Sequence, residues 1–160
     1  MPVKQPNSRM CFVCGLENPS GLHLHFYETA PGEVESTYTA PEHFQGYPGV
    51  LHGGIVATIL DEITGRALMG TDENPRFMYT AKIEVKYRYN VPLGVPLRLV
   101  GKALTVKTRT ATAWGGVYHP DGRLLAEATA LLMNVPADTL AETNLEALGW
   151  RIYPDEGNAE

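Results

Sequence analysis

The sequence predicts an α+β fold in which one long helix packs against an antiparallel sheet. The first observation is a single long apolar segment with helical spacing near the middle of the chain. The second is a set of segments in which apolar and polar residues alternate, as in strands that cover a core. The third is turn chemistry between such segments, at Pro31-Gly32 and at Pro120-Asp121-Gly122. Together these observations predict one helix and a sheet of five to six strands.

The expected elements run in the order of two strands, one long helix and four strands. They occupy residues 21–30 and 32–40, then 55–70, then 79–89, 97–108, 109–119 and 123–135. A short second helix is expected over 137–148. In the strand that follows the long helix, strict alternation places Thr80 on the polar side, which predicts that this side chain faces solvent.

Length and charge narrow the class of protein. The 160 residues suit a single domain over 1–160, with a loose N-terminus at 1–10 and a C-terminal extension at 137–160. The net charge of −5 argues against a broad nucleic-acid surface. No apolar run approaches the ~18 residues of a membrane span, and the first residues lack the apolar core of a secretory signal. We therefore expect a cytoplasmic protein with neither a nucleic-acid partner nor a membrane partner.

The expected long helix has two unlike faces. One face is broad and apolar, and it is formed by Ile55, Val56, Ile59, Leu60, Ile63 and Ala67. The opposite face is almost free of charge, and it is formed by Ala57, Thr58, Thr64, Gly65 and Leu68, with Asp61 among them. A helix face that meets water normally carries charge, so we expect a second copy of the protein to cover this face. That arrangement leaves Asp61 between two subunits.

Several short motifs follow one another along the chain. They are the opening CFVCGLENPSGL, the loop FQGYPGVLHGG, His52-Gly53-Gly54, Asp61-Glu62, and TAKIEVKYRYNVPLG from Thr80. This ordered set resembles the PaaI-like acyl-CoA thioesterases, which have the hotdog fold, and the resemblance covers roughly residues 11–135. It implies a curved sheet wrapped around the central helix, an acyl-CoA substrate and no cofactor. It also implies a homodimer with the active site at the subunit interface, and it leaves open whether dimers pair into a tetramer.

The motifs supply the groups that thioester hydrolysis needs, which are an attacking or base group and donors to the oxyanion. Glycine N–H groups at a helix N-terminus suit an oxyanion, and the resemblance implies that Gly53 is the donor, with Gly54 beside it binding substrate. Asp61, poorly solvated among small and apolar residues, suits either a general base on water or a nucleophile. The resemblance implies that His52 orients the thioester or the water, and that Thr80 assists the water across the dimer.

One position departs from the family pattern. Many relatives place Asn or Gln six residues before the histidine of the HGG motif, where this chain has Gly46. The adjacent Gln45 is the substitute we expect to bind substrate. Basic residues on the following strand, among them Lys86 and Arg88, form either a solvated face or a binding site for the phosphates of coenzyme A, and Arg88 is the candidate we name.

Two other functions fit parts of the sequence. The stretch 43–51 faintly resembles the loop of hotdog hydratases and dehydratases acting on acyl thioesters. Those enzymes pair the early histidine, here His43, with a helix acid fourteen residues later, where this chain has Ala57. A non-catalytic acyl-CoA-binding module is the other alternative. An acyl-CoA thioesterase remains the preferred function.

The pair Cys11 and Cys14 raises the question of a metal. With His23 and His25 the pair would supply four zinc-type ligands, and two residues apart on a strand both imidazoles point to one side. The relatives that share the cysteine turn lack the paired histidines, so we expect a structural turn with buried thiols and no metal.

Overall fold

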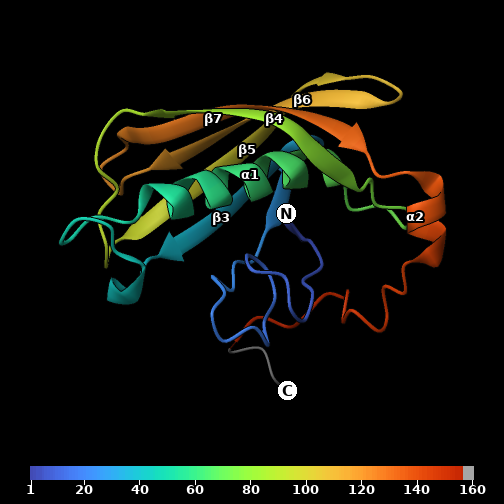
Figure 1. Ribbon diagram of the computed structural model, residues 1–160, viewed down its shortest axis with the longest axis horizontal. Helices are drawn as coiled ribbons and strands as arrows, with labels where there is room; N and C mark the ends of the chain where they lie inside the picture. The colour runs from blue at the N-terminus through green and yellow to red at the C-terminus, as the bar shows by residue number, and fades with distance from the viewer. Residues whose placement is uncertain (157–160) are drawn as a thin grey trace.

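In the computed structural model, which describes residues 1–156, a seven-stranded antiparallel sheet curves around one long helix, α1 (Figure 1). The strands are β1 (Val3–Lys4), β2 (Tyr27–Ala30), β3 (Glu33–Thr39), β4 (Met78–Tyr87), β5 (Pro96–Val106), β6 (Thr110–Tyr118) and β7 (Leu124–Asn134). The helical elements are α1 (Gly53–Met69), the short α2 (Ala137–Glu142) and the 3₁₀ turn η1 (Glu42–Phe44). Strand neighbours follow the order β1-β2-β3-β5-β6-β7-β4, so β4, which follows α1, lies at an edge.

The predicted fold class is confirmed, and the four strands after the helix lie where the alternation predicted them. The first expected strand is wrong in part, because residues 21–26 are irregular and β2 begins only at Tyr27. Within this stretch His23 has a positive φ of 56°, which a strand does not accommodate. The expected helix over 137–148 ends at Glu142, and β1 is a seventh strand too short to be recognised from two residues.

Ile63 determines how closely α1 approaches the sheet. The predicted apolar face of the helix is confirmed, with its residues buried against the sheet apart from the half-buried Ile55. Gly101 of β5 and Gly115 of β6 are paired across the two strands, and both contact Ile63. A Cβ on Gly101 would lie 2.4 Å from the Ile63 carbonyl oxygen, so only glycine permits this approach. Backbone contact therefore sets the position of α1 and of the side chains on its other faces.

The opposite face of α1 is less open than the sequence suggested. Thr64 and Leu68 are buried by the chain's own sheet, so the expectation that a second copy covers them is wrong. The strongly curved sheet reaches around the helix, and Leu68 packs with residues of β6 and β7. What remains half-exposed on this face is a narrow stripe, which we call the open face and which consists of Ala57, Thr58, Asp61 and Gly65.

The N-terminal segment is not loose, contrary to expectation. Gln5 and Asn7 are fully buried. The Gln5 amide donates to the Arg66 carbonyl oxygen at 3.1 Å, and the Asn7 amide donates to the carbonyl oxygens of Cys14 and Leu24, each at 2.8 Å. These polar side chains have buried partners, which is why a polar segment is ordered against the helix. Figure 1 shows this segment on the side of α1 that faces away from the sheet.

The C-terminal extension packs on the same side. Arg151 exchanges two backbone hydrogen bonds with Asn7, and Trp150 stacks edge-on against Phe77. Asp155 forms an ion pair with Lys4, and residues 157–160 lie outside the described part of the chain.

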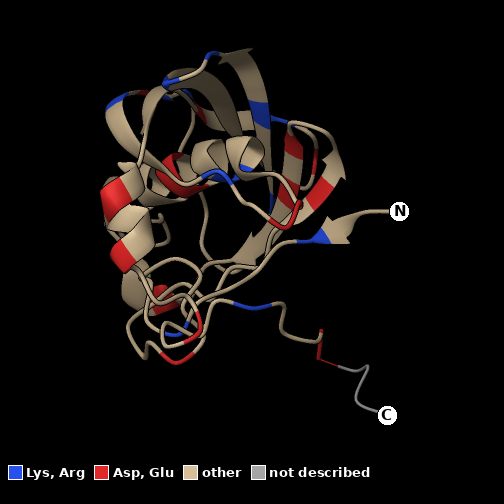
Figure 2. Ribbon diagram, turned by 90° about the vertical axis from the view of Figure 1, so that its right-hand side faces the viewer, with Lys and Arg blue, Asp and Glu red and all other residues tan. Residues whose placement is uncertain are grey.

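Figure 2 shows Lys and Arg scattered over strands and loops, and they do not gather into one basic patch in this view. Acidic residues lie on α2. Among residues 1–156, no helix is long and apolar enough to cross a membrane.

Candidate active site

His52 caps the N-terminus of α1 with its own side chain. Its Nδ1 accepts a 2.9 Å hydrogen bond from the Gly54 N–H. A nitrogen that accepts carries no proton, so the neutral ring has its proton on Nε2. The side chain is exposed, and it therefore presents an Nε2–H donor in front of the helix N-terminus. The Gly54 N–H, expected to bind substrate, is occupied by this cap.

Gly53 supplies the free backbone donor at this end of the helix. As the first residue of α1 it has no intrahelical acceptor, and within residues 1–156 its N–H makes no hydrogen bond. The Tyr87 hydroxyl donates to the Gly53 carbonyl oxygen at 2.7 Å. The peptide between Gly53 and Gly54 thus links Tyr87 on one side to His52 on the other. Sequence reasoning missed this role of Tyr87, because its place in the alternation of β4 indicated only packing.

Two cavities meet at Gly53. One, of about 530 Å³, is lined by Gln45, Gly46, Tyr47, Val50, Leu51, His52 and Gly53. The other, of about 290 Å³, is lined by Val50, Leu51, Gly53, Val56 and residues 87–91. A Cβ on Gly46 would lie 3.3 Å from the His52 Cα, so this position leaves little room for the amide side chain of the relatives. Gln45 is exposed beside it and is the amide that lines the cavity.

Asp61 and Thr80 lie together farther along the helix. The Thr80 hydroxyl donates to Asp61 Oδ1 at 2.6 Å, and both residues line a cavity of about 120 Å³ between α1 and β4. The two residues belong to the same chain. This contact forms within one chain, and the role of Thr80 in assisting the water across a dimer stays a prediction.

A β-bulge explains why Thr80 reaches the helix. Thr80 pairs with Leu132 of β7, and Lys82 pairs with Leu131, so Ala81 is an extra residue in β4. One extra residue reverses the alternation, and Thr80 consequently shares the inward side of the sheet with the buried Leu132. Thr80 is exposed, as its place in the alternation predicted, but the bulge also lets its hydroxyl reach Asp61 on the helix, which the alternation did not predict.

Glu62, the next residue, points into a different environment. It forms a 2.9 Å ion pair with Arg66 one turn later on α1. The Arg66 side chain is fully buried, donates to the Pro6 carbonyl oxygen at 2.7 Å and lies over the rings of Phe26 and Trp150. Glu62 is thus engaged in a salt bridge within its own helix. The sequence did not reveal that Arg66 is buried. Its spacing of four residues from Glu62 indicated only that the two side chains could form an ion pair on the helix.

The four zinc-type ligands considered for the cysteine turn, Cys11, Cys14, His23 and His25, do not come together. His25 donates through Nδ1 to the Asn7 side-chain oxygen at 3.2 Å, and His23 bonds the Asn18 carbonyl oxygen. Cys11 and Cys14 lie instead near Glu62. The hydrogen bond between the two thiols lowers the pKa of Cys14 and raises that of Cys11.

Arg88, the candidate for phosphate binding, already has a partner. Its Nε lies 2.6 Å from Glu127 Oε2, and this hydrogen bond holds the pKa of Glu127 below its usual range. The guanidinium is 43% exposed and the residue lines the cavity of about 290 Å³ beside Gly53. A ligand phosphate could therefore reach Arg88 while competing with Glu127.

The candidate site is divided between two places in one chain. Gly53 and Asp61 are separated by eight residues of a single helix, which corresponds to about 12 Å along its axis. They also line different cavities. A reacting carbonyl must lie about 3 Å from both its oxyanion donor and its attacking group. The structure therefore joins Gly53 with His52, and Asp61 with Thr80, but one chain does not join the two pairs.

Comparisons with known proteins agree with this architecture. Residues 48–126 match the family model described as Thioesterase superfamily. Protein RHA08564, a thioesterase superfamily protein, has a TM-score of 0.71 and 30% identity, covering 78% of this chain and 60% of that one. A Streptococcus mutans protein solved with acetyl CoA has a TM-score of 0.63 over 70% of this chain and 88% of that one, but at 20% identity it supports the fold alone.

The curated relatives are 25–32% identical to this chain over the aligned residues. The acyl-coenzyme A thioesterase THEM4 of Mus musculus is 32% identical over 134 residues, which cover 82% of this chain and 56% of that protein. The Xenopus laevis protein of the same name is 29% identical over 111 residues, covering 69% and 49%. The chain thus spans about half the length of these relatives. The matched residues contain the HGG turn, the central helix and β4, so the chain has the hotdog fold and is similar to the thioesterase superfamily over about half of its length.

Proposed function

We propose that this protein hydrolyses acyl-CoA thioesters to a carboxylate and free coenzyme A. The observation that carries the proposal is the free N–H of Gly53 at the start of α1, where an oxyanion would gain both a hydrogen bond and the favourable end of the helix dipole. The mouse and frog relatives are named acyl-coenzyme A thioesterases, which supports the same substrate class.

His52 and Tyr87 serve the oxyanion end of this site. The Nε2–H of His52 is a second donor, available to the thioester that enters the cavity shared with Gln45. Tyr87 is a positioning residue, because its hydroxyl fixes the peptide that holds His52 in the accepting tautomer. Both donors are preorganised before substrate arrives, so little reorganisation is needed as charge develops on the carbonyl oxygen.

Asp61 and Thr80 serve the attacking end. The Thr80 hydroxyl uses its hydrogen to bond Asp61 Oδ1. The Thr80 oxygen and Asp61 Oδ2 therefore remain available as two hydrogen-bond acceptors. A water donating one hydrogen to each would direct a lone pair at the thioester carbon. Asp61 then takes one proton from this water as it attacks, and the coenzyme A sulfur leaves with the electrons of the broken C–S bond. We therefore favour general-base catalysis over direct attack by the carboxylate.

A second copy would bring the two ends together. In a twofold dimer with the two α1 helices antiparallel and Ala57 at the axis, Gly53 lies opposite Asp61 of the partner subunit, because Ala57 is midway between them. The open face supports such a contact, since Ala57 and Gly65 allow close approach of backbones. β4 supports it as well, because its outer edge has no neighbouring strand among the described residues.

An assay of the purified protein against a panel of acyl-CoA thioesters, with detection of the released thiol, tests the proposed activity directly. We expect thiol release at a rate well above buffer for at least one acyl group. A hydratase would change the absorbance of an enoyl-CoA without releasing thiol, and a binding module would do neither. Either result would contradict the proposal.

Sedimentation tests the proposed assembly. We expect a dimer or a larger assembly at micromolar concentration, and Ala57→Arg should produce a monomer by inserting a long charged side chain into the open face. Thr37→Arg is the matched control, because Thr37 is exposed on β3, which lies far from β4 in the strand order. A wild-type monomer, or an Ala57→Arg dimer with full activity, would contradict a site shared between subunits.

A further inference from the structure

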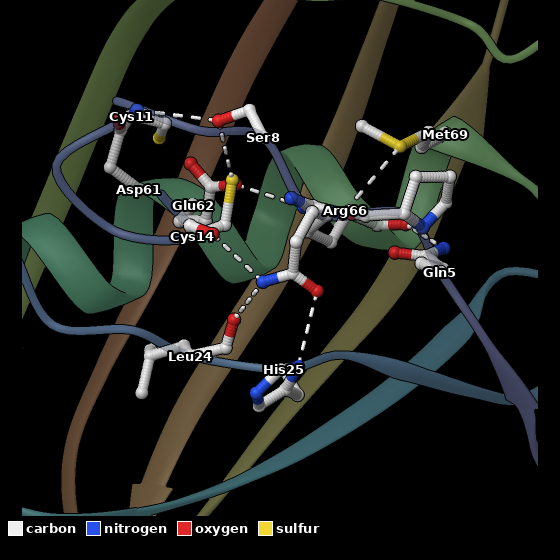
Figure 3. Close-up of polar contacts among 12 residues, drawn as sticks. Gln5, Ser8, Cys11, Cys14, Leu24, His25, Asp61, Glu62, Arg66 and Met69 are labelled. Carbon is white, nitrogen blue, oxygen red and sulfur yellow. Dashed lines mark hydrogen bonds and ion pairs between the residues drawn. The ribbon is translucent and has the colours of Figure 1, made fainter. Parts of the chain in front are cut away.

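Two sulfur ligands and one oxygen ligand gather on the face of α1 next to Asp61 (Figure 3). The Sγ atoms of Cys11 and Cys14 and a carboxylate oxygen of Glu62 all lie within 4.8 Å of one another. Cys14 is buried, whereas Cys11 and Glu62 are half-buried. The cysteines belong to the N-terminal segment and Glu62 to the central helix, so the fold alone brings them together.

The turn that carries the cysteines is held in shape from several sides. The Gly15 N–H donates to the Cys11 carbonyl oxygen at 2.8 Å, and a Cβ on Gly15 would lie 2.3 Å from that oxygen, so the turn requires glycine. The Ser8 hydroxyl accepts from the Cys11 N–H at 3.3 Å and lies 3.5 Å from Cys14 Sγ. Both sulfurs are thereby fixed on the side of the turn that faces Glu62.

We propose that Cys11, Cys14 and Glu62 bind a zinc ion, with a water molecule as the fourth ligand. In a tetrahedral zinc site with Zn–S bonds near 2.3 Å and Zn–O bonds near 2.0–2.2 Å, ligand atoms lie about 3.5–4 Å apart. The observed cluster is compatible with this spacing. Thiolates favour zinc over the hard cations magnesium and calcium.

Arg66 makes the charges of such a site balance. Two thiolates and the Glu62 carboxylate would carry three negative charges, which zinc and the buried guanidinium of Arg66 would neutralise together. The ion pair uses Glu62 Oε1, so Oε2 remains for the metal. The ion would tie the N-terminal segment to α1 beside Asp61. The proposal thus departs from the metal-free turn expected from the sequence, because the third protein ligand is a carboxylate of the helix rather than a histidine.

Metal analysis of the full chain, expressed with zinc supplementation and purified under reducing conditions without chelator, tests the proposal. We expect about one zinc per chain, as a single site requires. The chelator-stripped protein should bind one equivalent of Co²⁺ and develop thiolate-to-cobalt charge-transfer absorption. Chelation should also lower the midpoint of thermal unfolding.

Two adjacent acids provide matched variants. Glu62→Gln should weaken Co²⁺ binding at least tenfold, whereas Asp61→Asn should bind Co²⁺ like the wild type even though hydrolysis is lost. Cys14→Ser should abolish the charge-transfer absorption, and circular dichroism separates this loss from unfolding. Protein that lacks zinc and shows no charge-transfer absorption with Co²⁺ while fully reduced and folded would overturn the site. Undiminished Co²⁺ affinity in Glu62→Gln would overturn the assignment of Glu62.

Discussion

Asp61 and Glu62 are consecutive acids on one helix, yet they occupy opposite kinds of environment. Asp61 lies on the open face, and its carboxylate accepts a hydrogen bond from Thr80. Glu62, about 100° farther around the helix, lies against the N-terminal segment and is paired with the buried Arg66. On the open face, one oxygen of the Asp61 carboxylate remains available to a substrate or a water. On the other face, the Glu62 carboxylate is already engaged in an ion pair.

The difference comes from what covers each face of α1. The sheet curves around one side, and the segment containing Gln5 and Asn7 closes the side of Glu62. Only the open face is left for a second copy. Two neighbouring acids therefore differ in role, with chemistry proposed for Asp61 and an ion pair formed by Glu62, and single substitutions can separate the two.

Asp61→Asn should give the largest loss on the open face. Asparagine keeps the shape and the contact with Thr80 but removes the base, so kcat should fall by about 10²–10⁴ with a smaller change in KM. Steady-state kinetics with one acyl-CoA at one pH measure this, and sedimentation checks that the dimer persists. If Asp61→Asn stays active while Glu62→Gln is dead, the two acids have been assigned to the wrong faces.

Gly53→Pro should follow, with a loss of about 10²–10³ in kcat, because proline deletes the proposed oxyanion donor. Proline suits the first position of a helix, and His52 already has the extended ψ of 132° that a residue before proline prefers. Gly53→Ala is the matched control, since it keeps the N–H and its Cβ would make an ordinary 3.6 Å contact with Tyr87. Equal activity in the proline and alanine variants would exclude the donor role.

Thr80→Ala should have a moderate effect of about tenfold on kcat, the size expected for one hydrogen bond to a charged group. The base remains, but the water loses one of its two acceptors. Thr80→Ser should restore most of the rate, because it retains the hydroxyl that bonds Asp61. Failure of serine to rescue would mean that the methyl group of Thr80, rather than its hydroxyl, matters.

Glu62→Gln should have the smallest effect on kcat of the three substitutions at Asp61, Thr80 and Glu62. Its effect should appear in stability instead, because the buried Arg66 loses its charged partner, at a cost on the order of 3 kcal/mol. Denaturant unfolding measures this cost, with Asp61→Asn as the comparison that should unfold near the wild-type midpoint. A stability unchanged by Glu62→Gln would show that the ion pair contributes nothing.

Much of the fold followed from local pattern. Helical spacing located α1 and its apolar face, and alternation located β4 to β7, because burial on one side leaves a repeating signature. The N-terminal segment gave no such signature. Gln5 and Asn7 are polar residues buried by specific partners distant in sequence, and a rule based on polarity predicts a loose segment there.

The candidate site was only partly predictable for a similar reason. His52, Gly53 and Asp61 stand in recognisable motifs, but the orientation of Thr80 depends on the bulge at Ala81, which strict alternation cannot reveal. Likewise, the carboxylate near the cysteine turn comes from the helix, so no spacing within the turn could identify it. Contacts between distant elements, rather than residue types, were the missing information.

We propose that Gly53 of one subunit and Asp61 of the partner subunit act on the same thioester. A heterodimer made by co-expressing differently tagged Gly53→Pro and Asp61→Asn chains, purified through both tags, tests it directly. One of its two sites would carry both substitutions and the other neither, so we expect about half the wild-type turnover per dimer. If each site were built within a single chain, both sites would be defective, and activity no higher than that of the two parent variants would contradict the claim.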